Sequence, residues 1–334
     1  MNGRNFNDGL SGLIIGFCPS FFAPRAYRAR AALQAAFGNY YLNYHDQERD
    51  VSHLIKERAK IYRERGIDPL EIGKREMSVL QLATADVINT AFWLLLFIAC
   101  DPVATNMIRT EIICAITPKT GRVGWDEASL NIAKLEETCP MLVSAYKETE
   151  RLVVSQVSTR RVVEDTLISD GECNYLLKAG AEVQIPAGLC HLSKEVWGKH
   201  ADAFDFRRFY RPVTKGDAAK RIRKPDPASE AAQLELYRSQ MQAFFPFGGG
   251  KHLCPGRQYA SVQILALVAP LIMGFDIRSR DGGIIQRPEI VRARLGEAVS
   301  RPSSEGRRMG AILLRREEWQ GVVWKYTSDR NAIR

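Results

Sequence analysis

The segment Phe244–Arg257, FFPFGGGKHLCPGR, concentrates residues that could do chemistry. Cys254 stands directly before Pro255, and proline is favoured at the first position of a helix. Because the residues that follow are helical in pattern, we expect Cys254 at a helix N-terminus. Amide hydrogens and the positive end of the helix dipole stabilise a thiolate there. The segment therefore predicts a reactive or metal-binding thiolate.

Glycines in the same segment lack a Cβ and let the backbone pass close to a flat macrocycle. Two other interpretations compete. Gly250-Lys251 resembles part of a phosphate-binding loop, but no Ser or Thr follows Lys251 and the full spacing is missing. A lone cysteine in a glycine-rich turn is also often only a buried thiol. The glycines are Gly248, Gly249, Gly250 and Gly256.

Five residues, Phe247, Gly250, His252, Cys254 and Gly256, match at the correct spacing the haem-binding signature of the cytochrome P450 family, which this segment resembles. The resemblance implies a b-type haem whose iron is bound by Cys254, and such a thiolate pushes electron density toward oxygen–oxygen cleavage. It also implies that Phe247 packs near the sulfur and keeps water out. His252 would contact a haem propionate, at a position that is most often Arg in the family.

Glu148 and Arg151 are separated by three positions, so they share a helix face and can pair. Charged pairs at this spacing usually lie on a solvated surface. The stretch resembles the E-x-x-R helix of the family, which implies that the pair joins a second Arg downstream. The candidate is Arg208, although the family usually carries Pro where Phe206 stands. The planar guanidinium suits a carboxylate partner, and the resemblance implies a structural role for all three charged residues.

The run Ala85-Asp86-Val87-Ile88-Asn89-Thr90 lies where the family carries an acid and a Thr that manage protons for dioxygen activation. Ile88 replaces the acid and Asn89 replaces the first Thr, and the resemblance implies catalytic roles for Asn89 and Thr90. The stretch Asn89–Trp93 is similar to the sterol 7α-hydroxylase and prostacyclin synthase branch, which contains monooxygenases and an isomerase. Alternatively, Asn89 only bonds to the preceding helical turn.

Periodicity predicts the elements that position these residues. Arg25–Arg65 is expected to form one or two amphipathic helices. Glu76–Cys100 is expected to form one long helix of roughly 37 Å. Because its second half is nearly apolar, it should run through the middle of a domain, and the family resemblance implies that it lies over the haem. Further helices are predicted at Pro102–Ile116, Asp126–Lys134, Met141–Arg151 and Arg257–Phe275.

β-Branched residues predict short strands within Val153–Val163 and Tyr175–Ile185. Thr214–Ala231 is expected to be a loop, and Arg294–Trp324 to form antiparallel strands joined by Ser303–Arg308. The fold class is mainly α with small β-sheets (α+β). The resemblance implies a single partial cytochrome P450 domain over residues 1–334 that lacks the N-terminal portion of the fold. Its segments would be residues 1–24 for substrate entry, 76–100 for the long helix, 141–151 for the E-x-x-R helix, and 242–275 for the ligand loop and following helix.

The 334 residues are 46% hydrophobic and carry a formal net charge of +9, an ordinary globular composition with a basic excess. That excess is either a solvated surface or a docking face for an acidic partner. No helix-turn-helix, finger or RNA-binding signature is present, so we expect no nucleic-acid partner. The seven cysteines include no C-x-x-C pair, which argues against a zinc site or a disulfide framework.

Leu10–Phe22 is apolar but interrupted, and it is shorter than the roughly 20 residues that cross a bilayer. It is either a buried loop-helix or a surface that touches membrane. The resemblance implies the cytoplasmic face of the endoplasmic reticulum membrane, with contact through residues 10–22 and a missing anchor. Because the family places several elements before the long helix, we expect a fragment, an incomplete gene model or a reduced paralogue, fungal in style.

Three functions stay open. The first is a monooxygenase that takes electrons from NADPH–cytochrome P450 reductase and oxidises a lipophilic small molecule, in fungal secondary metabolism or in sterol or terpenoid modification. The second is a haem-thiolate isomerase that needs no reductase, and the third is a non-catalytic remnant. A reductase would dock on the Cys254 side, where basic residues gather. They are Lys251 and Arg257 beside the ligand, and Lys220, Arg221, Arg223 and Lys224 in the preceding loop.

Overall fold

Prolines begin several helices in the computed structural model, which describes residues 2–120, 125–210, 227–303, 305–306 and 310–327. Helix α7, for example, begins at Pro102, and the Asp101 side chain accepts hydrogen bonds from the amides of Val103 and Ala104. Proline suits this position because the first amides of a helix have no partner within it. The chain divides into two compact units, Met1–Asp86 with Arg294–Glu297 (unit 1) and Val87–Ala293 with Ala298–Arg334 (unit 2).

Unit 1 is helical, and its helices cross closely. A Cβ added to Gly73 would lie 2.4 Å from the amide nitrogen of Gly38, so the two backbones meet where glycines face each other. Two ion pairs, Arg58–Glu76 and Arg63–Asp46, join its helices and turns. The predicted helices within Arg25–Arg65 are confirmed as α4 and α5. The elements are α1 Asn2–Asp8, α2 Leu10–Ile15, α3 Pro19–Phe22, α4 Pro24–Leu42, η1 His45–Gln47, α5 His53–Glu64 and the first part of α6 Pro69–Ala99.

Helix α6 is the predicted long helix, and it begins at Pro69, earlier than the expected Glu76. Its length and composition would also suit a membrane span. However, Trp93, Leu94 and Ile98 are fully buried in protein, as expected for a core helix. The Trp93 indole donates a buried hydrogen bond of 2.8 Å to the carbonyl of Ser300, which fixes this end of the helix in unit 2.

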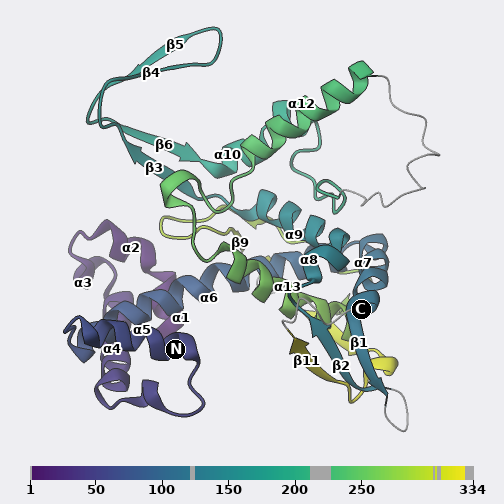
Figure 1. The fold of residues 1–334 in the computed structure, drawn as a ribbon, viewed down its shortest axis with the longest axis horizontal. Coiled ribbons are helices and arrows are strands. Elements are labelled where there is room, and N and C mark those ends of the chain that lie inside the picture. Colours follow the sequence, from purple (N-terminus) through teal and green to yellow (C-terminus); the bar gives the residue numbers. More distant parts are fainter. Residues whose placement is uncertain (1, 121–124, 211–226, 304, 307–309, 328–334) are drawn as a thin grey trace. The chain divides into compact units, whose positions relative to one another are not determined.

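The main core of unit 2 is built from the second half of α6 together with α7, α9 and α13 (Figure 1). Each of these helices contributes aliphatic side chains to one cluster, for example Leu94, Ile108, Leu142 and Val268. The helices of unit 2 besides α6 are α7 Pro102–Ala115, α8 Leu135–Thr138, α9 Pro140–Val153, α10 Ala187–Leu192, α11 Lys194–Trp197, α12 Pro227–Ala243, η3 Gly250–His252, α13 Arg257–Gly274 and η5 Glu317–Trp319.

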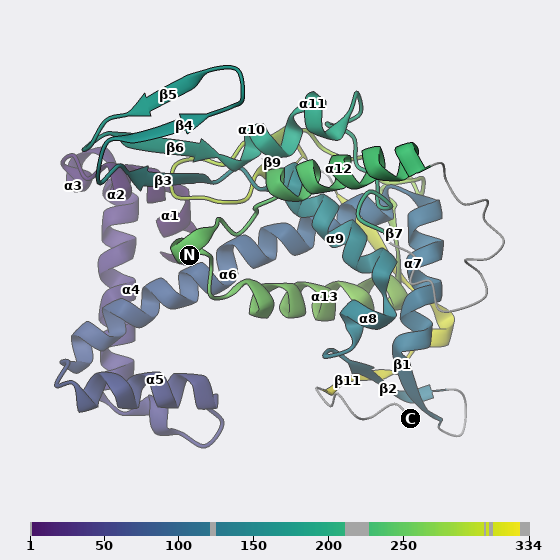
Figure 2. The ribbon, with the colours of Figure 1, turned by 45° about the horizontal axis from the view of Figure 1, so that its top comes forward.

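Small sheets accompany these helices, and the β4–β5 hairpin extends beyond the β3–β6 pair (Figure 2). The strands are β1 Ile116–Thr120, β2 Trp125–Asn131, β3 Val157–Arg161, β4 Thr166–Ser169, β5 Asn174–Leu177, β6 Glu182–Pro186, β7 Phe275–Ser279, β8 Ile290–Val291, β9 Arg301–Pro302, β10 Ala311–Arg315 and β11 Val323–Thr327. All pairs are antiparallel except β2–β11, which is parallel. The architecture is mainly α with small β-sheets.

Three sequence predictions about elements were wrong in whole or part. The predicted helix Asp126–Lys134 is largely strand β2, because Ala128 and Leu130 alternate into the core with a period of two. Most of the predicted loop Thr214–Ala231 lies outside the described residues, and its end belongs to helix α12. In the tail Arg294–Trp324, β9 and β10 do not pair with each other, since β9 pairs with β8 and β10 with β7.

Candidate haem-thiolate site

The turn that carries Cys254 is closed by its own backbone. The amide of Cys254 donates to the carbonyl of Phe247 at 3.0 Å, and the amide of Leu253 donates to that of Gly250 at 3.2 Å. Gly250 adopts a φ of +60°, a left-handed conformation that favours glycine. The turn leads into α13, an 18-residue helix. Helix α13 begins at Arg257 with Gly256 as its N-cap, two residues later than the start at Pro255 that the proline position predicted, so the half-buried Cys254 lies two positions before the N-cap.

The surroundings of this thiol fit a metal that is already held in a macrocycle. Within the described ranges, no group of three or more His, Cys, Asp and Glu side chains could hold a metal ion. A single thiolate can instead supply the axial ligand to haem iron. A Cβ added to Gly249 or Gly250 would meet nothing within 4 Å, so open space lies beside the turn, and one added to Gly256 would lie 3.8 Å from the Cys254 sulfur.

Three side chains hold the turn from behind, one from strand β3, one from helix α10 and one from the residue just before β3. The amide of Gln156 donates to the carbonyl of Pro246 at 2.8 Å, and the guanidinium of Arg160 donates to that of Gly249 at 3.0 Å. The backbone amide of Phe245 donates to Nε2 of His191 at 3.2 Å. Burial lowers the pKa of His191 to about 4, which keeps its imidazole neutral and able to accept this bond.

The sequence held no signal for Gln156, Arg160 and His191. Each of them bonds to a backbone atom of the turn, more than fifty positions further along the chain. Because their partners at the turn are backbone atoms, these bonds do not require particular residue types there. No local sequence pattern could therefore identify the three side chains. They are supporting groups that fix where the Cys254 turn lies.

Glu148, Arg151 and Arg208, predicted as one cluster, are brought together in unit 2. Arg151 donates to the two carboxylate oxygens of Glu148 at 2.8 and 2.7 Å, and both side chains are fully buried. Arg208 Nε lies 3.0 and 3.1 Å from the same two oxygens. Arg151 also donates to the carbonyls of His191 and Ala201 at 2.7 and 2.6 Å. Phe206, at the position where the family usually has Pro, is buried in the core of unit 2.

The predicted catalytic residues Asn89 and Thr90 lie on α6 within unit 2. Thr90 is buried and Asn89 is half-buried, while Ile88 is 61% exposed. In the part of the chain that the structure describes, the Asn89 carboxamide forms no hydrogen bond, so the alternative bond to the preceding turn is absent. His252 and Lys251 are exposed on the ligand turn, and Phe247 is half-buried.

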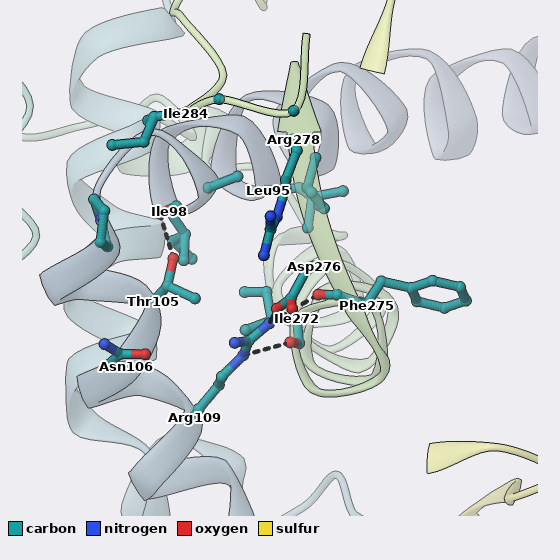
Figure 3. A pocket seen from close by; sticks show the side chains of 15 residues that line it. Leu95, Ile98, Thr105, Asn106, Arg109, Ile272, Phe275, Asp276, Arg278 and Ile284 are labelled. Carbon is teal, nitrogen blue, oxygen red and sulfur yellow. Dashed lines mark hydrogen bonds and ion pairs between the residues drawn. The ribbon is translucent and has the colours of Figure 1, made fainter. Parts of the chain in front are cut away.

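A cavity of about 360 Å³ lies elsewhere in unit 2, between α7, the end of α6 and strand β7 (Figure 3). Arg109 reaches across it, donates to the carbonyls of Ile272 and Phe275 at 2.9 and 2.8 Å, and pairs with Asp276 at 2.7 Å. None of the predicted site residues lines this cavity. Arg109 there ties α7 to the end of α13 and to β7.

Comparisons with known proteins agree with this geometry. The family model described as Cytochrome P450 matches residues 45–294. A cytochrome P450 monooxygenase of Gibberella zeae is 31% identical over 329 residues, which are 97% of this chain and 59% of that relative. A 25-hydroxycholesterol 7-alpha-hydroxylase of Rattus norvegicus is 27% identical over 232 residues, 69% of this chain and 52% of the relative. The crystal structure of a cytochrome P450 described as CYP102L1 is 19% identical, with a TM-score of 0.62 over 93% of this chain and 64% of the other.

The match over residues 45–294 shows that the chain belongs to the cytochrome P450 family, and membership of this family implies a haem-thiolate cofactor. The predicted fold class is thereby confirmed. The chain spans 59% of the length of its Gibberella zeae relative. What that relative and the others do as whole proteins therefore enters only as a proposal for this chain.

Proposed function

We propose that this protein is a haem-thiolate monooxygenase that oxidises a lipophilic small molecule with electrons from NADPH–cytochrome P450 reductase. The observation that carries the proposal is the closed turn that places Cys254 before α13, beside open space at Gly249 and Gly250. The similarity to a cytochrome P450 monooxygenase of Gibberella zeae supports the monooxygenase, and a role in fungal secondary metabolism is part of the proposal. The weaker similarity to a 25-hydroxycholesterol 7-alpha-hydroxylase supports a sterol or terpenoid substrate and the sterol 7α-hydroxylase branch.

The residues of the turn would divide the work of holding b-type haem. Cys254 provides the thiolate that binds the iron. Phe247 shields the sulfur from water, and exposed His252 offers a polar contact to a propionate. Gly250 and Gly256 keep the turn free of side chains near the macrocycle. When bound, the haem supplies the chemistry that activates dioxygen.

On α6, Asn89 and Thr90 would hold hydrogen bonds near the reacting oxygen. The Asn89 carboxamide has no partner among the described residues, so it is free to donate to a water or to substrate. Ile88 supplies no acid at the neighbouring position, so we assign proton delivery to Thr90 and Asn89. The absence of an acid at position 88 also favours the alternative function, an isomerase, because an isomerase needs no proton delivery.

A reductase would approach the Cys254 side. Lys251 is exposed on the ligand turn and Arg257 is half-buried at the start of α13. The other basic residues of the predicted docking face, Lys220, Arg221, Arg223 and Lys224, lie outside the described residues. Basic side chains steer an acidic partner at long range, and salt weakens that steering.

We also propose that residues 10–22 touch a membrane surface, which the family resemblance leads us to expect is the endoplasmic reticulum. Phe21 is 77% exposed, and Ile15, Phe17 and Phe22 are exposed as well. This exposure argues for a surface that touches membrane and against a buried loop-helix. Flotation of the protein with phospholipid vesicles, and its loss in a Phe21→Ser variant, tests the contact.

The test of function supplies haem-loaded protein with lipophilic substrates, NADPH and purified reductase. A monooxygenase forms product that carries one oxygen atom from labelled dioxygen, only when NADPH and reductase are both present. Lys251→Glu should slow reduction at low salt, with exposed Glu172→Lys in the β4–β5 turn as a control. Rearrangement of a lipid peroxide without NADPH would establish the isomerase, and a protein that binds no haem would establish the remnant.

A further inference from the structure

A cavity of about 330 Å³ lies behind the Cys254 turn, between α8, α9, the turn and the start of α13. On one side it is lined by Phe247 and Leu253, and Leu253 directly precedes Cys254. On the other side it is lined by Tyr146 and Glu150 of α9. One space thus joins the proposed ligand turn to two ionisable side chains that the proposed mechanism does not use.

Glu150 is buried, only 4% exposed, and so is Tyr146. The Tyr146 hydroxyl donates to the Glu150 carboxyl at 2.5 Å. No cation bonds to Glu150 in the described part of the chain, in contrast to Glu148, which two arginines hold. Burial raises the pKa of Glu150 to about 8, and the Tyr146 hydrogen bond and Lys147 lower it less. The pair is therefore neutral at neutral pH.

Few charges face this pair. Glu136 of α8, Lys147 of α9 and Arg257 of α13 line the same cavity. Glu136 and Lys147 are exposed, so water screens them, and the turn itself contributes aromatic, glycine, proline and leucine residues. Because Glu150 itself is buried, a negative charge on it would be less screened by water than the charges of Glu136 and Lys147. An apolar side chain would pack here without this cost, which marks Glu150 as a candidate for function.

We propose that Glu150, in its hydrogen-bonded pair with Tyr146, is a positioning residue that sets the reduction potential of the haem-thiolate centre. The inference rests on the proposed haem ligation by Cys254. While the pair is neutral, Glu150 adds no charge to the centre. When Glu150 ionises, its negative charge stabilises the ferric state relative to the ferrous state, so reduction becomes harder.

The first arm of the test measures the reduction potential of haem-loaded protein between about pH 6 and about pH 9.5, on either side of the Glu150 pKa. In the parent the potential should fall as pH rises through about 8. Glu150→Gln should lose this fall. Glu136→Gln, which removes an exposed acid of the same cavity, should keep it. Tyr146→Phe should move the fall to higher pH, because the lost hydrogen bond no longer lowers the Glu150 pKa.

The second arm needs no haem chemistry. Infrared spectra at neutral pH should show the carbonyl band of a protonated carboxylic acid that Glu150→Gln removes. If the band is absent, or if parent and Glu150→Gln follow the same potential–pH curve with intact thiolate spectra, the proposal is overturned. If no variant gives a thiolate spectrum, the haem assignment itself fails, and the infrared result still reports the state of Glu150.

Discussion

Glu148 and Glu150 lie two positions apart on α9 and are both buried, but within the described residues only Glu148 forms ion pairs. Its carboxylate is held by Arg151 and Arg208, and Arg151 also binds the carbonyls of His191 and Ala201. Charge compensation of this kind makes each partner depend on the other. The stability of Glu148 therefore depends on its arginine partners, whereas Glu150 is buried without them. Each situation leads to a prediction.

Removing one member of the Glu148 cluster should be costly. Glu148→Ala or Arg151→Ala leaves a buried charge uncompensated, and the expected loss of unfolding free energy is about 3–5 kcal/mol. Urea denaturation and the haem content of purified protein measure the effect. Lys147→Ala, on the exposed face of the same helix, is the control and should stay near the parent. Normal folding and haem content in both cluster variants would show that the pair has no structural role.

Glu150 should make the protein less stable at high pH. Its pKa is raised from the ordinary value of 4.5 to about 8 in the folded chain. Between these values the folded state binds more protons than the unfolded state, so the free energy of unfolding falls as pH rises through this window. Glu150→Gln removes that fall. The difference between the urea midpoints at about pH 5 and about pH 9 should be larger for the parent than for the variant. Equal differences would count against a buried neutral acid.

At the scale of elements, glycines allow one close approach of two helices. In unit 1, α4 and the first part of α6 meet at Gly38 and Gly73. Gly73→Ala puts a methyl group into the backbone of the facing helix. It should lower the free energy of unfolding by about 1–3 kcal/mol or more. Gly3→Ala in helix α1, where a Cβ meets nothing within 4 Å, is the matched control and should not lower stability, since alanine is the better helix former. Thermal unfolding of the two variants measures the difference, and equal midpoints would contradict this helix crossing.

The ligand turn offers a second matched pair. Gly250 has a φ of +60°, whereas Gly249 has an extended φ of −165°, and a Cβ at either position meets open space. Gly250→Ala should therefore lower the free energy of unfolding by about 1–2 kcal/mol through backbone strain. Gly249→Ala should lower it little. Denaturation of haem-free protein isolates this backbone effect. A larger loss for Gly249→Ala would mean that the turn has another conformation.

The elements also show what the sequence could and could not predict. Helices α4, α5, α7, α9 and α13 followed from periodicity and proline positions, since long periodic segments carry their signal locally. Strand β2 did not, because its helix-forming residues are overruled by pairing with β1 on one side and β11 on the other. The pairing of β9 and β10 failed for the same reason, since their partners β8 and β7 are set by tertiary structure.

At the scale of the whole molecule, the family was predictable because its signature is local and dense. The Cys254 turn and the Glu148–Arg151 spacing lie within short stretches, and the family match over residues 45–294 contains both. The groups that support the turn, Gln156, Arg160 and His191, come from distant segments and were not predictable. The substrate is likewise encoded in the shape of a pocket and not in any motif.

The central claim is that Cys254 supplies a thiolate to haem iron, and one measurement tests it directly. Haem-loaded protein is reduced, exposed to carbon monoxide and examined by absorption spectroscopy, for the parent, Cys254→Ser and the exposed-cysteine control Cys173→Ser. The parent and Cys173→Ser should show the strongly red-shifted Soret band of thiolate ligation, and Cys254→Ser should lack it. A thiolate band that persists in Cys254→Ser, or that is absent from the haem-loaded parent, would contradict the assignment.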